Sequence, residues 1–222
     1  MQHVLFIITS TSVVGTGKHS TGYEFSEVAD PYFEFIKQGC AVDFASILGG
    51  TPPAAGYDAS SKNSKGFKES NGFRRLGFSH RLSDIDVAAY DAVFFPGGLG
   101  PMVDMVDNPA IKNATRKTYE SGRIVGAVCH GPVALLNVQL SDGRTLIEGK
   151  RITSFTEAEE RADNHTLGDV IPFLLDRALT EQGAVFSKAE PFESHVVVDG
   201  NLITGQNPAS ASGVAAEMIK LL

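Results

Sequence analysis

The stretch that decides the fold is Ile124-Val125-Gly126-Ala127-Val128-Cys129-His130-Gly131-Pro132. Its first five residues are a continuous apolar run, which is typical of a strand buried on both faces of a parallel sheet. Small residues stand near Cys129 on either side, and Pro132 lies where a helix begins, a position that tolerates proline. Strand, sharp turn and helix in this order indicate a nucleophile elbow, which exposes its reactive side chain at the carboxyl end of a sheet.

Cys129 is therefore predicted to be the nucleophile of an enzyme. The positive end of the following helix points at the sulfur and favours the thiolate, which is the reactive form. The plainer alternative is a buried cysteine that only ends a strand, but a packing residue has no need of the adjoining His130-Gly131-Pro132. The second cysteine, Cys40, has no His or carboxylate placed to help it and is predicted to be structural.

Apolar runs alternate with amphipathic stretches along the chain, which predicts an α/β fold with a mostly parallel sheet sandwiched by helices. We expect one domain over residues 1–222, and no internal repeat is visible. Expected strands cover 4–8, 41–45, 92–95, 124–128 and a segment near 152–155, with a hairpin over 195–204. Expected helices cover 27–38, 110–121, 132–137, 170–182 and 209–222.

Residues 48–71 have a different composition, rich in Gly, Pro, Ser, Asn and Lys. The composition predicts a long polar loop. Loops of this length inside a compact domain are often lids or binding loops. The sequence leaves open whether this loop covers a pocket or lies on the surface without a role in binding.

The bulk composition excludes several classes of protein. Charged residues make up 20% of the chain and the net charge is −7, with Lys and Arg scattered, which argues against nucleic-acid binding. The apolar start of the chain is too short to span a membrane and lacks the features of a signal peptide. Two cysteines do not form a disulfide framework, so we expect a soluble cytoplasmic protein with free thiols. No histidines have paired ligand spacing, so neither a metal nor another cofactor is predicted.

A second chemical element is Pro96-Gly97-Gly98, directly after the apolar run Ala92–Phe95. A glycine pair in this place lets backbone N–H groups point into the crevice above the sheet, where open α/β sheets bind ligands. The N–H of Gly98 and that of His130 are predicted to form an oxyanion hole.

Three motifs together resemble the ThiJ/PfpI superfamily, whose fold is flavodoxin-like and shared with the class I glutamine amidotransferases. They are Phe95 to Met102, Ala127 to Pro132, and Ile203-Thr204-Gly205-Gln206-Asn207-Pro208-Ala209-Ser210. The segment Thr21-Gly22 to Glu27, continuing to Tyr32, is similar to the N-terminal signature of the branch that holds the glutathione-independent glyoxalases and heat-shock chaperones called glyoxalase III. The likeness runs almost from end to end.

The resemblance implies roles for particular residues. Cys129 would be the nucleophile, His130 its neighbouring acid/base, and Glu27 the carboxylate that faces the sulfur. The acid that partners His130 would follow the Ser154-Phe155 strand and is placed at Glu157, with Glu159 and Glu160 as alternatives. A homodimer is also implied.

Two departures bear on function. The glyoxalase III branch often has His after the glycine pair, where this chain has Leu99. Class I glutaminases combine a Cys elbow with a distant His-x-Glu pair, but no His-x-Glu occurs here and His195 is followed by two valines. The sequence therefore argues against a glutaminase.

The predicted function is conversion of methylglyoxal and related 2-oxoaldehydes to 2-hydroxy acids such as lactate, without glutathione, with deglycation as an associated activity. Two alternatives stay open. One is a stress-response holdase chaperone or thiol sensor in which Cys129 is oxidised. The other is a small cysteine amidase or hydrolase, since one elbow supports several chemistries.

Overall fold

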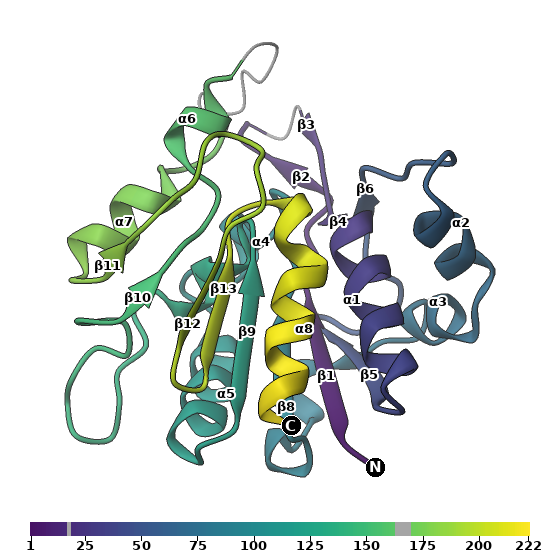
Figure 1. Ribbon diagram of the computed structural model, residues 1–222, viewed down its shortest axis with the longest axis horizontal. Coiled ribbons are helices and arrows are strands. Elements are labelled where there is room, and N and C mark those ends of the chain that lie inside the picture. The colour runs from purple at the N-terminus through teal and green to yellow at the C-terminus, as the bar shows by residue number, and fades with distance from the viewer. Residues whose placement is uncertain (17–18, 163–169) are drawn as a thin grey trace.

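A seven-stranded sheet organises the computed structural model, which describes residues 1–16, 19–162 and 170–222 (Figure 1). The strand order is β12-β13-β9-β8-β1-β5-β7, and the neighbours are parallel except for antiparallel β12 and β13. The strands are β1 (His3–Ile8), β5 (Ala41–Ser46), β7 (His80–Arg81), β8 (Ala92–Phe95), β9 (Ile124–Val128), β12 (Val196–Asp199) and β13 (Leu202–Gly205). The predicted mostly parallel α/β fold is confirmed.

Helices cover both faces of this sheet (Figure 1). One apolar core joins the sheet to α1 (Phe25–Lys37) and α8 (Ala211–Leu221), and the other joins it to α4 (Pro101–Asp104), α5 (Pro109–Glu120) and α7 (Leu175–Glu181). The central strand β1 shows why its sequence is a continuous apolar run. Phe6 and its alternate neighbours face the first core, while Leu5 and Ile7 face the second.

Short elements complete the chain. They are β2 (Val13–Val14), β3 (His19–Ser20), β4 (Tyr23–Glu24), β6 (Ala54–Ala55), β10 (Arg151–Ile152), β11 (Val185–Phe186), α6 (Glu157–Glu160), and 3₁₀ helices at Leu82–Asp84, Val87–Ala89, Gly131–Leu135 and Pro208–Ser210. Strands β2 and β3, β4 and β6, and β10 and β11 pair with each other. Among the described residues, no helix has the length and apolar character needed to cross a membrane.

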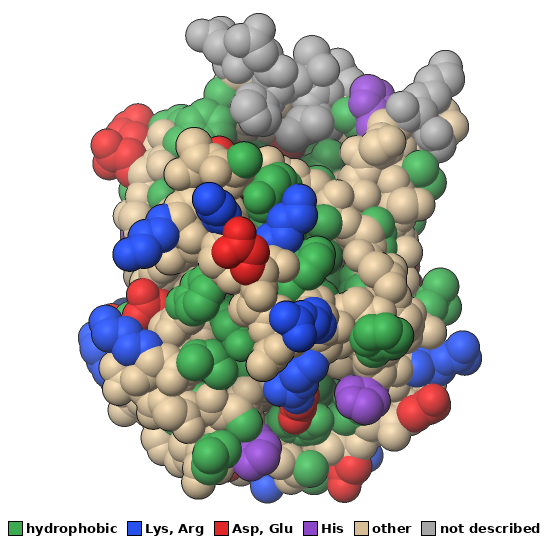
Figure 2. All heavy atoms as spheres, turned by 90° about the vertical axis from the view of Figure 1, so that its right-hand side faces the viewer, with side chains coloured by type: hydrophobic (Ala, Val, Ile, Leu, Met, Phe, Trp, Pro, Cys, Tyr) green, Lys and Arg blue, Asp and Glu red, His purple; other side chains and the backbone are tan. Residues whose placement is uncertain are grey.

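The prediction of a continuous loop over 48–71 is wrong. This region contains β6 and α2 (Lys62–Glu69), and α3 (Asn71–Leu76) follows at once. The hydroxyls of Ser61 and Ser70 cap the two helices by accepting backbone hydrogen bonds, which serine does well at a helix start. Figure 2 views this side of the molecule and shows Lys and Arg side chains interspersed with apolar ones.

Two other predicted helices are shorter than expected. The segment after the elbow is the 3₁₀ helix Gly131–Leu135 rather than an α-helix to residue 137, and the helix expected over 170–182 is α7, which begins at Leu175. The predicted hairpin is confirmed as β12 and β13, which turn at Gly200 with φ 61°.

Candidate active site

Cys129 sits at the end of β9 in a backbone conformation that L-residues seldom adopt, with φ 61°. Its N–H donates to the carbonyl of Gly205 (2.9 Å), and its carbonyl accepts from the N–H of Phe155 (2.9 Å). A Cβ at position 131 would lie 2.1 Å from the carbonyl oxygen of Phe95, so only glycine fits after the turn. The geometry is that of a nucleophile elbow held by β13 on one side and by the segment after β10 on the other.

His130 links the thiol to a buried acid. Its Nδ1 lies 3.3 Å from Cys129 Sγ, and its Nε2 lies 2.5 Å from Glu160 Oε1. The side chains of His130 and Glu160 are 3% and 2% exposed, so water does not weaken the contact. With Nε2–H donating to the carboxylate, Nδ1 is the basic nitrogen, and it faces the sulfur.

Glu27, on α1, is fully buried on the other side of the thiol. Its Oε2 accepts a hydrogen bond from the N–H of Gly97 (2.6 Å). Burial, and then the negative charge of Glu24, raise the pKa of Glu27 well above its usual value. Burial and the facing Glu27 carboxyl also raise the pKa of the Cys129 thiol. A hydrogen bond from the Cys129 thiol acts in the opposite direction and lowers the pKa of Glu27, but burial outweighs it. The two neighbouring groups therefore titrate together, and Glu27 is suited to carry a proton near the sulfur.

The glycine pair fits closely against this arrangement. The N–H of Gly98 donates a hydrogen bond to the sulfur of Cys129, which acts to lower the pKa of the thiol. Gly98 has φ 89°, which favours glycine. A Cβ on Gly97 would lie 2.7 Å from the backbone nitrogen of His130 and 2.8 Å from the Cys129 Cβ. The segment after β8 therefore approaches the elbow so closely that no side chain fits at position 97.

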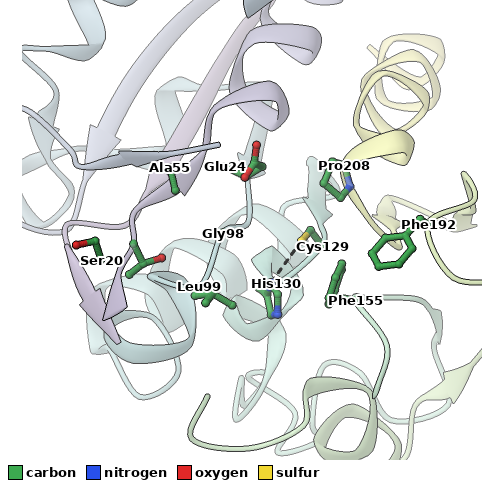
Figure 3. Close-up of a pocket in the computed structure, with 11 residues that line it drawn as sticks. Ser20, Glu24, Ala55, Gly98, Leu99, Cys129, His130, Phe155, Phe192 and Pro208 are labelled. Atoms are coloured by element: carbon green, nitrogen blue, oxygen red, sulfur yellow. Dashed lines mark hydrogen bonds between the residues drawn. The ribbon is translucent and has the colours of Figure 1, made fainter. Parts of the chain in front are cut away.

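A cavity of about 500 Å³ opens onto Cys129 and His130 (Figure 3). Phe155 and Phe192 stand on one side of the thiol, and Glu24 and Ala55 stand across from them. The Phe155 ring lies 4.8 Å from the His130 ring, centroid to centroid. Further lining residues are Ser20, Thr21, Gly98, Leu99 and Pro208. A small molecule that reaches the sulfur is therefore surrounded by aromatic, hydroxyl and carboxyl groups.

A model of the DJ-1/PfpI family matches residues 19–221, which include the whole of this site. The chain belongs to the DJ-1/PfpI family. The resemblance seen in the sequence motifs is thereby confirmed.

Several proteins with solved structures superpose closely on this chain. The Rapid Encystment Protein of 24 kDa from Francisella tularensis is 34% identical with a TM-score of 0.93, and 99% of this chain and 98% of that chain are covered. Glyoxalase III from Candida albicans is 28% identical with a TM-score of 0.85, covering 99% and 96%. In sequence, the glutathione-independent glyoxalase HSP31 of Saccharomyces cerevisiae is 30% identical over 99% of this chain and 97% of its own.

The prediction that Glu157 is the partner of His130 is wrong, since Glu160 occupies that place. Glu157 lies at the surface, where its carboxylate accepts hydrogen bonds from Arg161 (2.8 Å) and Arg177. The pair Glu157 and Arg161 is spaced i,i+4, which is a typical surface ion pair on a helix and could have been recognised in the sequence.

Glu159, the remaining alternative, is a buried structural anchor. Its carboxylate accepts hydrogen bonds from the N–H and hydroxyl of Thr156, the N–H of Phe192, and the side-chain amides of Gln206 and Asn207. Thr156 and Glu159 form a capping box, a pattern visible in the sequence as Thr-x-x-Glu. These bonds hold the start of α6, and therefore Glu160, in place beside the loop that carries Phe192.

Glu24, Phe155 and Phe192 line the cavity but were not predicted as site residues. His195, which the sequence argued against as a partner of Cys129, instead lies with its Nε2 2.9 Å from the hydroxyl of Ser187. Both cysteines are free thiols, and Cys40 is buried. Within the described ranges, no group of three or more His, Cys, Asp or Glu side chains is arranged to hold a metal ion.

Proposed function

We propose that this chain is a glutathione-independent glyoxalase that converts methylglyoxal and related 2-oxoaldehydes to 2-hydroxy acids. The observation that carries the proposal is a buried thiol set between the basic nitrogen of a His130–Glu160 pair and the Glu27 carboxyl. The relatives named glyoxalase, whose chains match over nearly their whole length, support the same activity.

The first step is addition of the sulfur to the aldehyde carbon. His130 Nδ1, 3.3 Å from Sγ, takes the thiol proton as the carbon–sulfur bond forms. The aldehyde oxygen receives this proton from the His130 imidazolium, and the product is a hemithioacetal. The Gly98 N–H, which acts to lower the pKa of the thiol, is the first proposed donor to the negative charge that develops on the aldehyde oxygen. The backbone N–H of His130 is the second proposed donor.

The second step moves hydrogen between the two substrate carbons. A proton leaves the hemithioacetal carbon to give an enediol, and a proton returns to the neighbouring carbon to give a thioester of the 2-hydroxy acid. This requires a group that accepts and returns a proton. Glu27 is suited because burial raises the pKa of its carboxyl well above its usual value. Water then hydrolyses the thioester, releases the acid and restores the thiol. The aldehyde carbon is oxidised and its neighbour reduced, so no outside oxidant is needed.

The decisive experiment is Cys129→Ala in glutathione-free buffer, with formation of lactate from methylglyoxal followed by NMR. We expect lactate formation to fall to the uncatalysed background, because no other described thiol lines the cavity. Cys40→Ser is the matched control and should keep wild-type turnover. Unchanged lactate formation by Cys129→Ala would overturn the proposal. A wild type inactive on oxoaldehydes but protective in a client-aggregation assay would favour the chaperone alternative, and one active only on amides or esters would favour the hydrolase.

A cytoplasmic homodimer and an associated deglycase activity also stay proposals. Light scattering coupled to size-exclusion chromatography measures the oligomeric state. A separate deglycase activity requires that the rate of deglycation exceed the rate at which the enzyme removes free methylglyoxal.

A further inference from the structure

The cavity contains a carboxylate that the proposed reaction does not use. Glu24 ends β4 and pairs with Ala55 of β6, and its side chain lines the cavity opposite Phe155 and Phe192 (Figure 3). Its Oε1 accepts a hydrogen bond from the hydroxyl of Ser26 (3.3 Å). A Cβ on Gly56 would lie 2.1 Å from that same oxygen, so the carboxylate packs directly against the glycine backbone. The structure thus holds Glu24 in a fixed place on the cavity wall.

The ionisable groups around the cavity are mostly acidic. Glu24 lies on the wall and Glu27 lies behind the thiol, while the imidazole of His130 is paired with the Glu160 carboxylate. Of the described residues that line the cavity, none is Lys or Arg. No ion pair to Glu24 is found in the described part of the chain.

The field of Glu24 reaches the reacting groups. Its charge raises the pKa of Glu27 and, as a smaller contribution, that of Cys129. Burial raises the pKa of Glu24 itself, while hydrogen bonds from Ser26 and the Phe25 N–H oppose this. A carboxylate that acts electrostatically on the thiol acts equally on any charged compound that approaches the thiol.

We propose that Glu24 is a specificity-determining residue that repels anionic compounds from Cys129 and admits neutral carbonyl compounds. A 2-oxoaldehyde enters uncharged, whereas a carbonyl compound that already bears a carboxylate meets the charge of Glu24. Resting on the proposed function, a second consequence concerns the product. Hydrolysis of the thioester releases a carboxylate and a proton, so repulsion begins only when the reaction is complete and favours release of the acid.

The test compares alkylation of Cys129 by iodoacetamide, which is neutral, and iodoacetate, which is anionic and of similar size. In both cases the thiolate forms a carbon–sulfur bond and iodide leaves. The rate ratio, iodoacetamide over iodoacetate, is divided by the same ratio for free cysteine. Because both reagents react with the same thiolate, changes in the pKa of Cys129 cancel. Cys40→Ser is the background, so that only one thiol reacts.

In this background we expect the normalised ratio to lie well above one. Glu24→Gln, which keeps the shape and removes the charge, should lower it by about 5- to 10-fold, the effect of one charge several ångströms away in a medium of intermediate dielectric. Glu69→Gln at the exposed end of α2 changes net charge equally and should leave the ratio unchanged. An unchanged ratio in a folded Glu24→Gln protein would overturn the proposal.

A measurement without the variant keeps the proposal testable if Glu24→Gln does not fold. Raising the salt concentration from about 0.02 M to about 0.5 M screens charges and should bring the ratio toward one. A ratio equal to one at low salt overturns the role of Glu24.

Lactate inhibition of methylglyoxal turnover addresses the product. We expect Glu24→Gln to bind lactate several-fold more tightly than wild type. If wild type forms no lactate, the proposed glyoxalase function fails while the alkylation ratio still decides the role of Glu24. If wild type forms lactate but the ratio is one, only the role of Glu24 fails.

Discussion

Exchanging Glu160 for Gln tests the most consequential contact of the site. The Glu160 carboxylate accepts from His130 Nε2 at 2.5 Å, and this bond decides that Nδ1 is the basic nitrogen facing the thiol. Glutamine keeps an oxygen at the same reach but carries no charge, and its amide can also turn its NH₂ toward the ring. The imidazolium that forms when His130 takes the thiol proton therefore loses its counter-charge.

The magnitude follows from burial. With both side chains no more than 3% exposed, the contact is a buried charge-assisted hydrogen bond, a type that contributes about 1.5–3 kcal/mol. If that energy is lost only when His130 is charged, kcat/KM falls by about 10- to 150-fold. Glu157→Gln is the matched control. Its partners Arg161 and Arg177 are 58% and 62% exposed, and we expect kcat/KM within about twofold of wild type.

The assay measures kcat/KM for methylglyoxal across pH, together with the rate of Cys129 alkylation and the midpoint of thermal unfolding. A loss of turnover by Glu160→Gln that far exceeds any change in unfolding midpoint identifies the contact as functional. Full turnover by Glu160→Gln, or an equal loss of turnover by Glu157→Gln, would contradict this role of Glu160.

Three further predictions concern single groups. Glu27→Gln removes a carboxyl that raises the pKa of Cys129, so the alkylation rate of that thiol should rise at lower pH than in wild type, while lactate formation falls about 100-fold or more. Gly97→Ala forces a Cβ to within 2.7 Å of the His130 nitrogen and should lower the free energy of unfolding by about 1–3 kcal/mol in denaturant titrations. Lys112 has a buried Nζ without a hydrogen-bond partner among the described residues, and burial lowers its pKa to about 8, so Lys112→Met should stabilise the protein by about 1–3 kcal/mol at pH 7.

The size of the Lys112 effect depends on pH. The pKa of the folded state lies below the usual 10.5, so the destabilisation is complete below pH 8 and disappears as the pH rises toward 10.5. An equal gain from Lys112→Met at pH 7 and pH 10 contradicts this account. For Gly97→Ala the control is Gly66→Ala in α2, where a Cβ meets its nearest atom at 3.4 Å and stability should not fall. If the pH dependence of Cys129 alkylation is the same in Glu27→Gln and in wild type, Glu27 does not raise the pKa of Cys129 as described.

The sheet could be predicted because its strands are buried on both faces. In β1, β8 and β9 nearly every residue is apolar, and short apolar runs that end at glycine or proline are typical of strands inside a parallel sheet. The elbow at Cys129 could also be predicted, because local geometry requires both the small neighbouring residues and the proline. These features depend on short stretches of chain.

Residues 62–76 were not predicted to be helical because their composition favours loops. The helices α2 and α3 form nonetheless, since Ser61 and Ser70 cap them and Phe67 and Leu76 anchor them in the core. Tertiary packing here outweighs weak helix propensity.

The acid that partners His130 could not be chosen from spacing alone. Glu157, Glu159 and Glu160 fall in one turn of helix, and the selection depends on the arginines, amides and imidazole brought around α6 from distant segments. Glu24 was missed for a related reason, because its place in the cavity depends on the pairing of β4 with β6, two strands of two residues each.

The order of the strands has a consequence for synthesis of the chain. The N–H of Cys129 bonds to Gly205, and β9 takes β13 as its neighbour along most of its length. Because β13 leaves the ribosome some seventy residues after Cys129, the elbow lacks its hydrogen bond to β13 through most of the later translation. A nascent or C-terminally truncated chain thus lacks one of the two backbone hydrogen bonds that hold Cys129. The backbone conformation of Cys129 is therefore fully held only after β13 has been synthesised.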